Sequence, residues 1–179
     1  GVFGVSIITV LGPALADSYI AKDQSRFTRQ LDWAILAAGI LGIPSAIGLL
    51  LFCEPIIMTL FHHGKFTHHD VVMTAQSLRV LALGIPGFMW AKVLASAFYT
   101  RQDTKTPAWC ATIGLLANVV LALVLMKPLG HCCTALAVVV QYYLQIIILQ
   151  VYLAKHNIYR VSKKVYTTLA KICIASVAM

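Results

Sequence analysis

Charged residues are scarce in this sequence, and acidic residues are especially few. Only 11% of the 179 residues are charged, and six of these are Asp or Glu. A soluble globular domain carries about 25% charged residues, so the composition excludes an ordinary soluble fold. No paired carboxylates, phosphate-binding loop or nucleophile–base pair can be identified. We therefore expect that the protein is not an enzyme.

The five cysteines lack any spacing that indicates a disulfide framework or a zinc site. No CxxC occurs, and a bridge between the neighbours Cys132 and Cys133 would be strained. We expect the cysteines to serve as small apolar residues in helices. Histidines gather in the turn at residues 62–69, but they do not have the HExxH spacing of a metal site. We expect neither a metal nor a cofactor.

Long apolar segments dominate what is present. The sequence is 60% hydrophobic, with a mean hydropathy of +0.84, and a membrane-spanning helix needs about 20 mostly apolar residues. We predict an all-α fold, a polytopic transmembrane helical bundle that forms one region. The chain begins and ends inside apolar segments, so we expect a fragment of a longer protein. The predicted helices, of which the first and last are truncated, are residues 1–16, 31–52, 68–99, 107–126, 132–153 and 165–179.

Two boundaries carry specific signals. Glu54-Pro55 is expected to end the second segment, because proline interrupts the helical hydrogen bonds. This would leave residues 56–61 as a short stretch along the membrane interface. Thr106 followed by Pro107 is typical of an N-cap with proline at the first helical position, so the fourth segment is predicted to begin there.

Positive charges alternate between successive loops. Loops one, three and five hold nine cations, whereas loops two and four hold only Lys65 and Lys127. Cytoplasmic loops of membrane proteins are enriched in Lys and Arg, so we predict that loops one, three and five face the cytoplasm. This distribution also explains the net charge of +8 without nucleic-acid binding, which we do not expect. The nine cations are Lys22, Arg26, Arg29, Arg101, Lys105, Lys155, Arg160, Lys163 and Lys164.

Charged side chains inside or near the apolar segments are the candidate site residues. Lys92 lies about 10 Å before the cytoplasmic turn formed by Arg101, Asp103 and Lys105, at 1.5 Å per residue. Intramembrane charges usually face a water-filled path or a partner, but a lysine can also extend toward the headgroups. Arg79, near the opposite interface, has the same two interpretations.

Backbone and amide features suggest further roles. Gly84, Pro86 and Gly87 lie between the two cations and could form either a hinge or a static kink. Asn118 and Gln141 are polar residues within segments. They could hydrogen-bond between helices or line a hydrophilic cavity.

Several motifs resemble the MurJ (MviN) family of lipid II flippases. These are Gly1-Val2-Phe3-Gly4-Val5, Leu31-Asp32-Trp33, Gly64-Lys65-Phe66-Thr67, Lys92-Val93-Leu94-Ala95, Pro128-Leu129-Gly130-His131 and, most specifically, Arg101-Gln102-Asp103-Thr104-Lys105-Thr106-Pro107. The sequence departs from the family at Ala122, where relatives often carry a second polar residue after Asn118.

The resemblance implies part of a fourteen-helix transporter in the bacterial inner membrane. Such a protein would move lipid-linked peptidoglycan precursor to the periplasmic leaflet by alternating access, among membrane lipids and with other cell-wall synthesis proteins as potential partners. Lys92, Arg79, Asn118 and Gln141 would belong to the substrate cavity. The alternatives are an exporter of another lipid-linked glycan or of drugs, and a membrane scaffold that transports nothing.

Overall fold

The structure is a computed structural model that describes residues 9, 12–13, 15–18, 21, 23–61, 68–129, 132–155 and 163–177. Its main elements are helices α2 (Gln24–Phe61), α3 (His68–Tyr99), α4 (Lys105–Leu129), α5 (Cys132–Lys155) and α6 (Lys163–Val177). Four of them, α2 to α5, are long and apolar enough to cross a membrane. The predicted all-α, polytopic fold is therefore confirmed.

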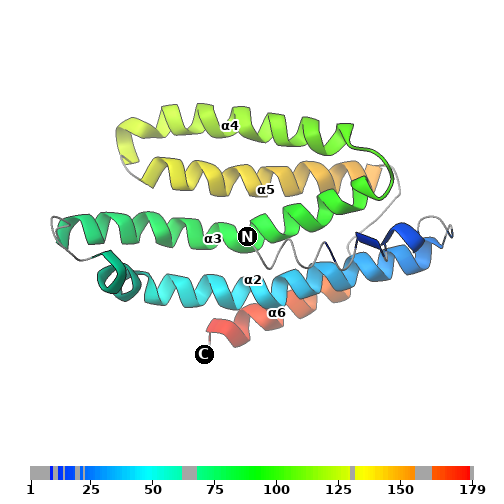
Figure 1. The fold of residues 1–179 in the computed structure, drawn as a ribbon, viewed down its shortest axis with the longest axis horizontal. Coiled ribbons are helices and arrows are strands. Elements are labelled where there is room, and N and C mark those ends of the chain that lie inside the picture. Colours follow the sequence, from blue (N-terminus) through cyan, green and yellow to red (C-terminus); the bar gives the residue numbers. More distant parts are fainter. Residues whose placement is uncertain are drawn as a thin grey trace.

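The helices lie side by side and alternate in direction (Figure 1). The start of α2, the turn from α3 to α4, the end of α5 and the start of α6 all lie at the same end of the bundle, on the right in Figure 1. This is the alternation that the comparison of loop charges assumes. Seven of the nine cations of loops one, three and five belong to the described part of the chain: Arg26, Arg29, Arg101, Lys105, Lys155, Lys163 and Lys164.

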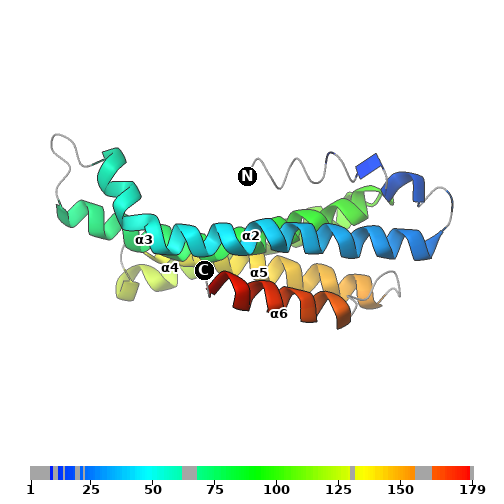
Figure 2. The same ribbon diagram turned by 90° about the horizontal axis from the view of Figure 1, so that it is seen from below.

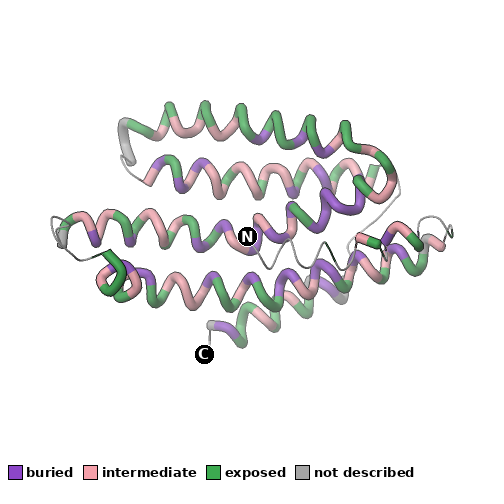
Figure 3. Tube along the Cα trace, viewed as in Figure 1, coloured by how far each residue is buried: buried purple, intermediate pink, exposed green. Residues whose placement is uncertain are grey.

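The main core forms where α2, α3, α5 and α6 meet. Leu31 from α2, Leu94 and Phe98 from α3, and Leu149 and Leu153 from α5 are almost completely buried there. By contrast, α4 packs mainly on α5 and exposes apolar side chains along most of its length (Figure 3). A surface of this kind is stable in lipid but not in water, so the burial pattern agrees with a membrane location.

Helix α2 extends beyond the predicted segment at its N-terminal end. The carboxylate of Asp23 accepts hydrogen bonds from the backbone N–H groups of Ser25 (3.2 Å) and Arg26 (3.1 Å) and from the Ser25 hydroxyl (2.7 Å). Asp23 is thus an N-cap, and the helix begins at Gln24, inside a stretch whose polarity suggested a loop.

The prediction that Glu54-Pro55 ends this helix is wrong, because α2 continues through Pro55 to Phe61. Its last turns leave the axis of the rest of the helix, which is visible in two views (Figures 1 and 2). Proline removes one hydrogen bond and bends a helix without always ending it. Residues 56–61 are accordingly the end of α2. The membrane boundaries themselves stay predictions, and most of the predicted segment 1–16 lies outside the described residues.

Candidate functional site

Lys92 lines a hollow between α3, α4 and α5 with a volume of about 440 Å³. Phe88 and Ser96 contribute from α3, and Tyr142 and Gln145 contribute from α5. The Lys92 side chain is exposed. This arrangement joins a cation, aromatic rings and an amide, which are the groups that bind anionic and sugar-like molecules.

The ring of Phe88 positions the Lys92 ammonium. Lys92 Nζ lies 5.5 Å from the centroid of the Phe88 ring, within the range of a cation–π contact. The same ring meets Tyr142 edge-on, with centroids 5.3 Å apart and planes at 73°. In the part of the chain that the structure describes, no carboxylate forms an ion pair with Lys92. Its positive charge is therefore available to a ligand in the hollow.

Arg79 lies elsewhere and has partners of its own. Its Nη2 lies 3.2 Å from Glu54 Oε2, and its Nε donates to Cys53 Sγ at 3.0 Å. Arg79 and Lys92 are about 20 Å apart along α3, at 1.5 Å per residue. Arg79 is not among the residues that line the Lys92 hollow. In this conformation it connects α3 to the bent end of α2.

Asn118 and Gln141 also lie away from the hollow, at the contact of α4 with α5. A methyl group on Gly114 would come within 3.2 Å of Gln141 Cγ, so the Gln141 side chain packs directly on α4. Asn118 Nδ2 is buried and has no hydrogen-bond partner among the described residues. Gln145, one turn beyond Gln141 in α5, does line the hollow.

At the predicted hinge, α3 lies close to both α5 and α2. A methyl group on Gly84 would lie 3.0 Å from Val139 Cγ2 of α5, and one on Gly87 would lie 3.5 Å from the Tyr143 ring. On the α2 side, a methyl group on Gly42 would lie 3.2 Å from Pro86 Cα. Glycine here allows close approach of the backbones. Motion at Pro86 stays a prediction.

The turn after α3 is a Schellman motif. The N–H of Asp103 donates to the Phe98 carbonyl (3.1 Å), and the N–H of Gln102 donates to the Tyr99 carbonyl (3.0 Å). Gln102 occupies the left-handed position with a φ of 60°, where glycine is the usual residue. The chain thus reverses sharply, and α4 can return along α5.

The prediction that Thr106 caps α4 is wrong. The helix begins at Lys105, and Thr106 already lies in its first turn, where its N–H donates to Asp103 Oδ1 at 3.1 Å and its hydroxyl donates to Asp103 Oδ2 at 2.6 Å. These hydrogen bonds, first the hydroxyl and then the backbone N–H of Thr106, lower the pKa of Asp103 below its ordinary value. Asp103 therefore has a structural role.

Two features of this region were not predicted from the sequence. One is the Glu54–Arg79 ion pair, whose partners are far apart in the chain. The other is the pair Tyr142-Tyr143. Two neighbouring tyrosines inside an apolar segment are visible in the sequence and could have indicated it. No group of three or more potential metal ligands occurs among the described residues, although the turn at 62–67 lies outside them.

Comparison with known proteins gives one consistent result. A family model described as "Lipid II flippase MurJ" matches residues 1–179. The probable lipid II flippase MurJ of Vibrio cholerae is 34% identical over the whole chain, which covers 34% of that protein. Its counterpart from Haemophilus influenzae is 35% identical, again over the whole chain and over 36% of that protein.

A solved structure agrees with the sequence comparisons. The structure titled "Lipid II flippase MurJ, inward closed conformation" superposes with a TM-score of 0.82 at 27% identity. The match covers 99% of this chain and 36% of the other. The chain therefore spans about a third of the length of the proteins it matches.

Proposed function

Because the chain belongs to the lipid II flippase MurJ family, we propose that the full-length protein moves lipid-linked peptidoglycan precursor across the bacterial inner membrane. The precursor would pass from the cytoplasmic to the periplasmic leaflet. The function is transport, with no bond made or broken by the protein. The helices α2 to α5, each long and apolar enough to span a bilayer, support a multi-pass location.

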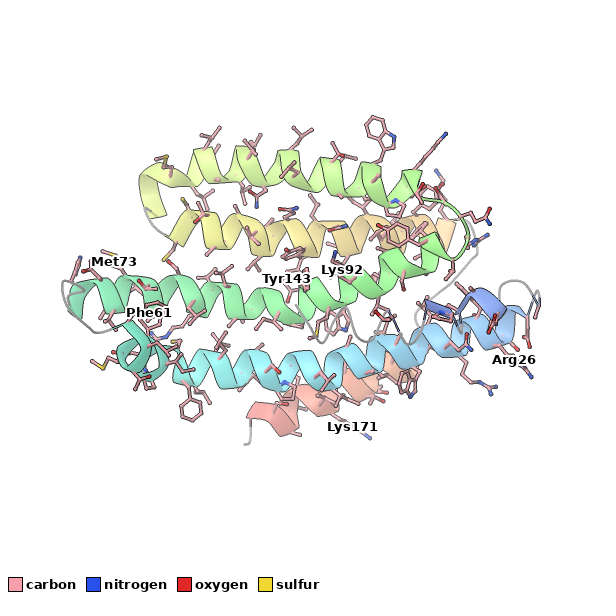
Figure 4. All side chains as sticks on the ribbon, in the orientation of Figure 1. Arg26, Phe61, Met73, Lys92, Tyr143 and Lys171 are labelled. Atoms are coloured by element: carbon pink, nitrogen blue, oxygen red, sulfur yellow. The ribbon has the colours of Figure 1, made fainter. Side chains whose placement is uncertain are left out.

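The observation that carries this proposal is the cation at the hollow, Lys92, which forms no ion pair with any residue that the structure describes. Lys92 lies in the central region of the bundle (Figure 4), on a helix long and apolar enough to span the membrane. Its side chain is exposed, and its Nζ lies 5.5 Å from the centroid of the Phe88 ring. A charge in such surroundings is costly and attracts an opposite charge more strongly than it would in water. The pyrophosphate of a lipid-linked precursor is a suitable counter-charge.

Other parts of the chain fit an alternating-access cycle. Pro86, with Gly84 and Gly87 beside it, gives α3 a point at which it can bend. Arg101 and Lys105 place positive charge at the end of the bundle that we assign to the cytoplasm, where they would anchor the turn at anionic headgroups. Membrane lipids are the immediate surroundings, and cell-wall synthesis proteins are potential further partners.

The test uses the complete gene in bacteria depleted of their own flippase. The measurement is the amount of lipid II exposed on the periplasmic face, in cells that carry wild type, Lys92→Ala or Lys92→Arg. We expect wild type to restore the exposure of lipid II. Lys92→Ala should reduce the rate at which lipid II becomes exposed about tenfold, since one charge-assisted contact is worth about 1.5 kcal/mol. Lys92→Arg keeps the charge and should retain most activity.

Lys171→Ala is the matched control, because Lys171 is an exposed lysine of α6 that does not line the hollow. It should transport like wild type. If wild type inserts correctly and restores no exposure, the substrate is not lipid II, and another exporter or a scaffold becomes the better interpretation. Normal transport by Lys92→Ala would contradict only the role given to Lys92.

A further inference from the structure

A side chain of α5 binds the backbone of α3 beside its proline. The Tyr143 hydroxyl donates to the Leu83 carbonyl, with 3.1 Å between the oxygens. Leu83 lies in the turn that precedes Pro86, where the proline ring crowds the backbone and its missing N–H interrupts the helical hydrogen bonds. Carbonyls in such a turn are open to side-chain donors from neighbouring helices. Tyr143 supplies a donor at that place.

The surroundings of this hydrogen bond are asymmetric. On one side Pro86 packs against Gly42 of α2, and on another Gly84 packs against Val139 of α5. Leu83, Pro86 and Tyr143 also line an apolar cavity of about 490 Å³. The hydrogen bond therefore lies at the edge of a cavity, on a side of α3 that lacks the close contacts made at Gly84 and Pro86.

The bend decides where the second half of α3 points. Figure 1 shows α3 changing direction near its middle, and Figure 4 shows Tyr143 and Lys92 in the same central region of the bundle. Lys92 and the α3 wall of its hollow lie beyond Pro86. A restraint at the bend consequently also positions Lys92.

We propose that Tyr143 is a latch that holds α3 in its bent conformation through the hydrogen bond to Leu83. When the bond opens, the half of α3 that carries Lys92 becomes free to change direction relative to the first half. Tyr143 is thus a positioning residue that acts on Lys92 through the backbone. The proposal concerns the conformation of α3 and is independent of which substrate the protein transports.

The test measures distances in the full-length protein between spin labels at Gln76 and Tyr99. These two exposed positions flank Pro86 and lie about 35 Å apart along the helix, at 1.5 Å per residue. We expect a narrow distance distribution in wild type and a broader or two-component one in Tyr143→Phe, which removes only the hydroxyl. Tyr142→Phe is the matched control, because it keeps the ring that contacts Phe88, and its distribution should match wild type.

A second experiment, with the same labels in a Pro86→Ala variant, distinguishes a latch from a general loss of packing. Pro86→Ala removes the ring that bends α3 and restores the N–H that bonds the Ala82 carbonyl, so the helix should be straight and Tyr143→Phe should have no further effect on the distances in that background. The proposal is overturned if Tyr143→Phe gives the wild-type distribution, if Tyr142→Phe broadens it equally, or if the Tyr143→Phe effect persists unchanged with Pro86→Ala.

Discussion

Asp103 and Thr106 are joined by two hydrogen bonds across the start of α4, one from the Thr106 backbone N–H and one from its hydroxyl. The N–H of Asp103 in turn donates to the Phe98 carbonyl at the end of α3. One residue therefore ends one helix and begins the next. The direction in which α4 leaves the turn depends on this carboxylate.

Removal of the carboxylate should destabilise the helical hairpin. Asp103→Ala loses both acceptors, and we expect it to lower the free energy of unfolding by about 1 kcal/mol, the usual value for an N-cap. Asp103→Asn keeps one acceptor and should lose less. The measurement is unfolding of the full-length protein in mixed micelles, with Lys105→Ala as the control at an exposed neighbour. Equal losses for Asp103→Ala and Lys105→Ala would contradict the capping role.

The cap should also depend on pH in a defined direction. The pKa of Asp103 is lowered in the folded protein by the hydroxyl and then the backbone N–H of Thr106, so the ionised carboxylate favours folding. The stabilisation is fully present above the ordinary value of 3.8 and is lost as the pH falls through the lower folded value. The difference in unfolding free energy between wild type and Asp103→Asn should thus shrink with acidification below this range. If this difference in unfolding free energy instead grew on acidification, the ionised form of Asp103 would not be the one that stabilises the fold.

Gln102 occupies a backbone position that favours glycine. Its φ of 60° costs a side-chain-bearing residue about 1 kcal/mol. We expect Gln102→Gly to raise the free energy of unfolding by about that amount, whereas Gln102→Ala keeps a β-carbon and should change it little. The same unfolding assay measures both variants. Stabilisation by alanine equal to that by glycine would mean that loss of the glutamine side chain, rather than the backbone conformation, is responsible.

The sequence predicts the helices well because their signals are long. Apolar segments of about 20 residues and the alternation of cations between loops are properties of whole stretches, so single substitutions do not obscure them. The helix ends were predicted less well, because several adjacent polar residues can act as a cap. Asp23 and Asp103, rather than the polar residues beside them, cap the helices because their carboxylates lie within hydrogen-bond distance of the first backbone N–H groups.

The candidate site shows a similar limit. That Lys92 faces a hollow could be suspected from its depth in an apolar segment, but the hollow itself is assembled from three helices. Arg79 had the same sequence signal as Lys92 and instead pairs with Glu54 of another helix. Which of the two cations pairs with a carboxylate is decided by tertiary contacts, and periodicity within one segment carries no information about them.

A methyl group added at Gly84 should strain the contact with α5 unless Val139 is made smaller. A Cβ at Gly84 would lie 3.0 Å from Val139 Cγ2, closer than carbon atoms normally approach. We expect Gly84→Ala to destabilise the protein by about 1 kcal/mol or more, and the added substitution Val139→Ala to recover most of the loss. Gly48→Ala in α2 is the control, because no atom lies within 4 Å of the added methyl group. There the higher helix propensity of alanine should stabilise slightly, so a similar gain for Gly84→Ala would exclude a close α3–α5 contact.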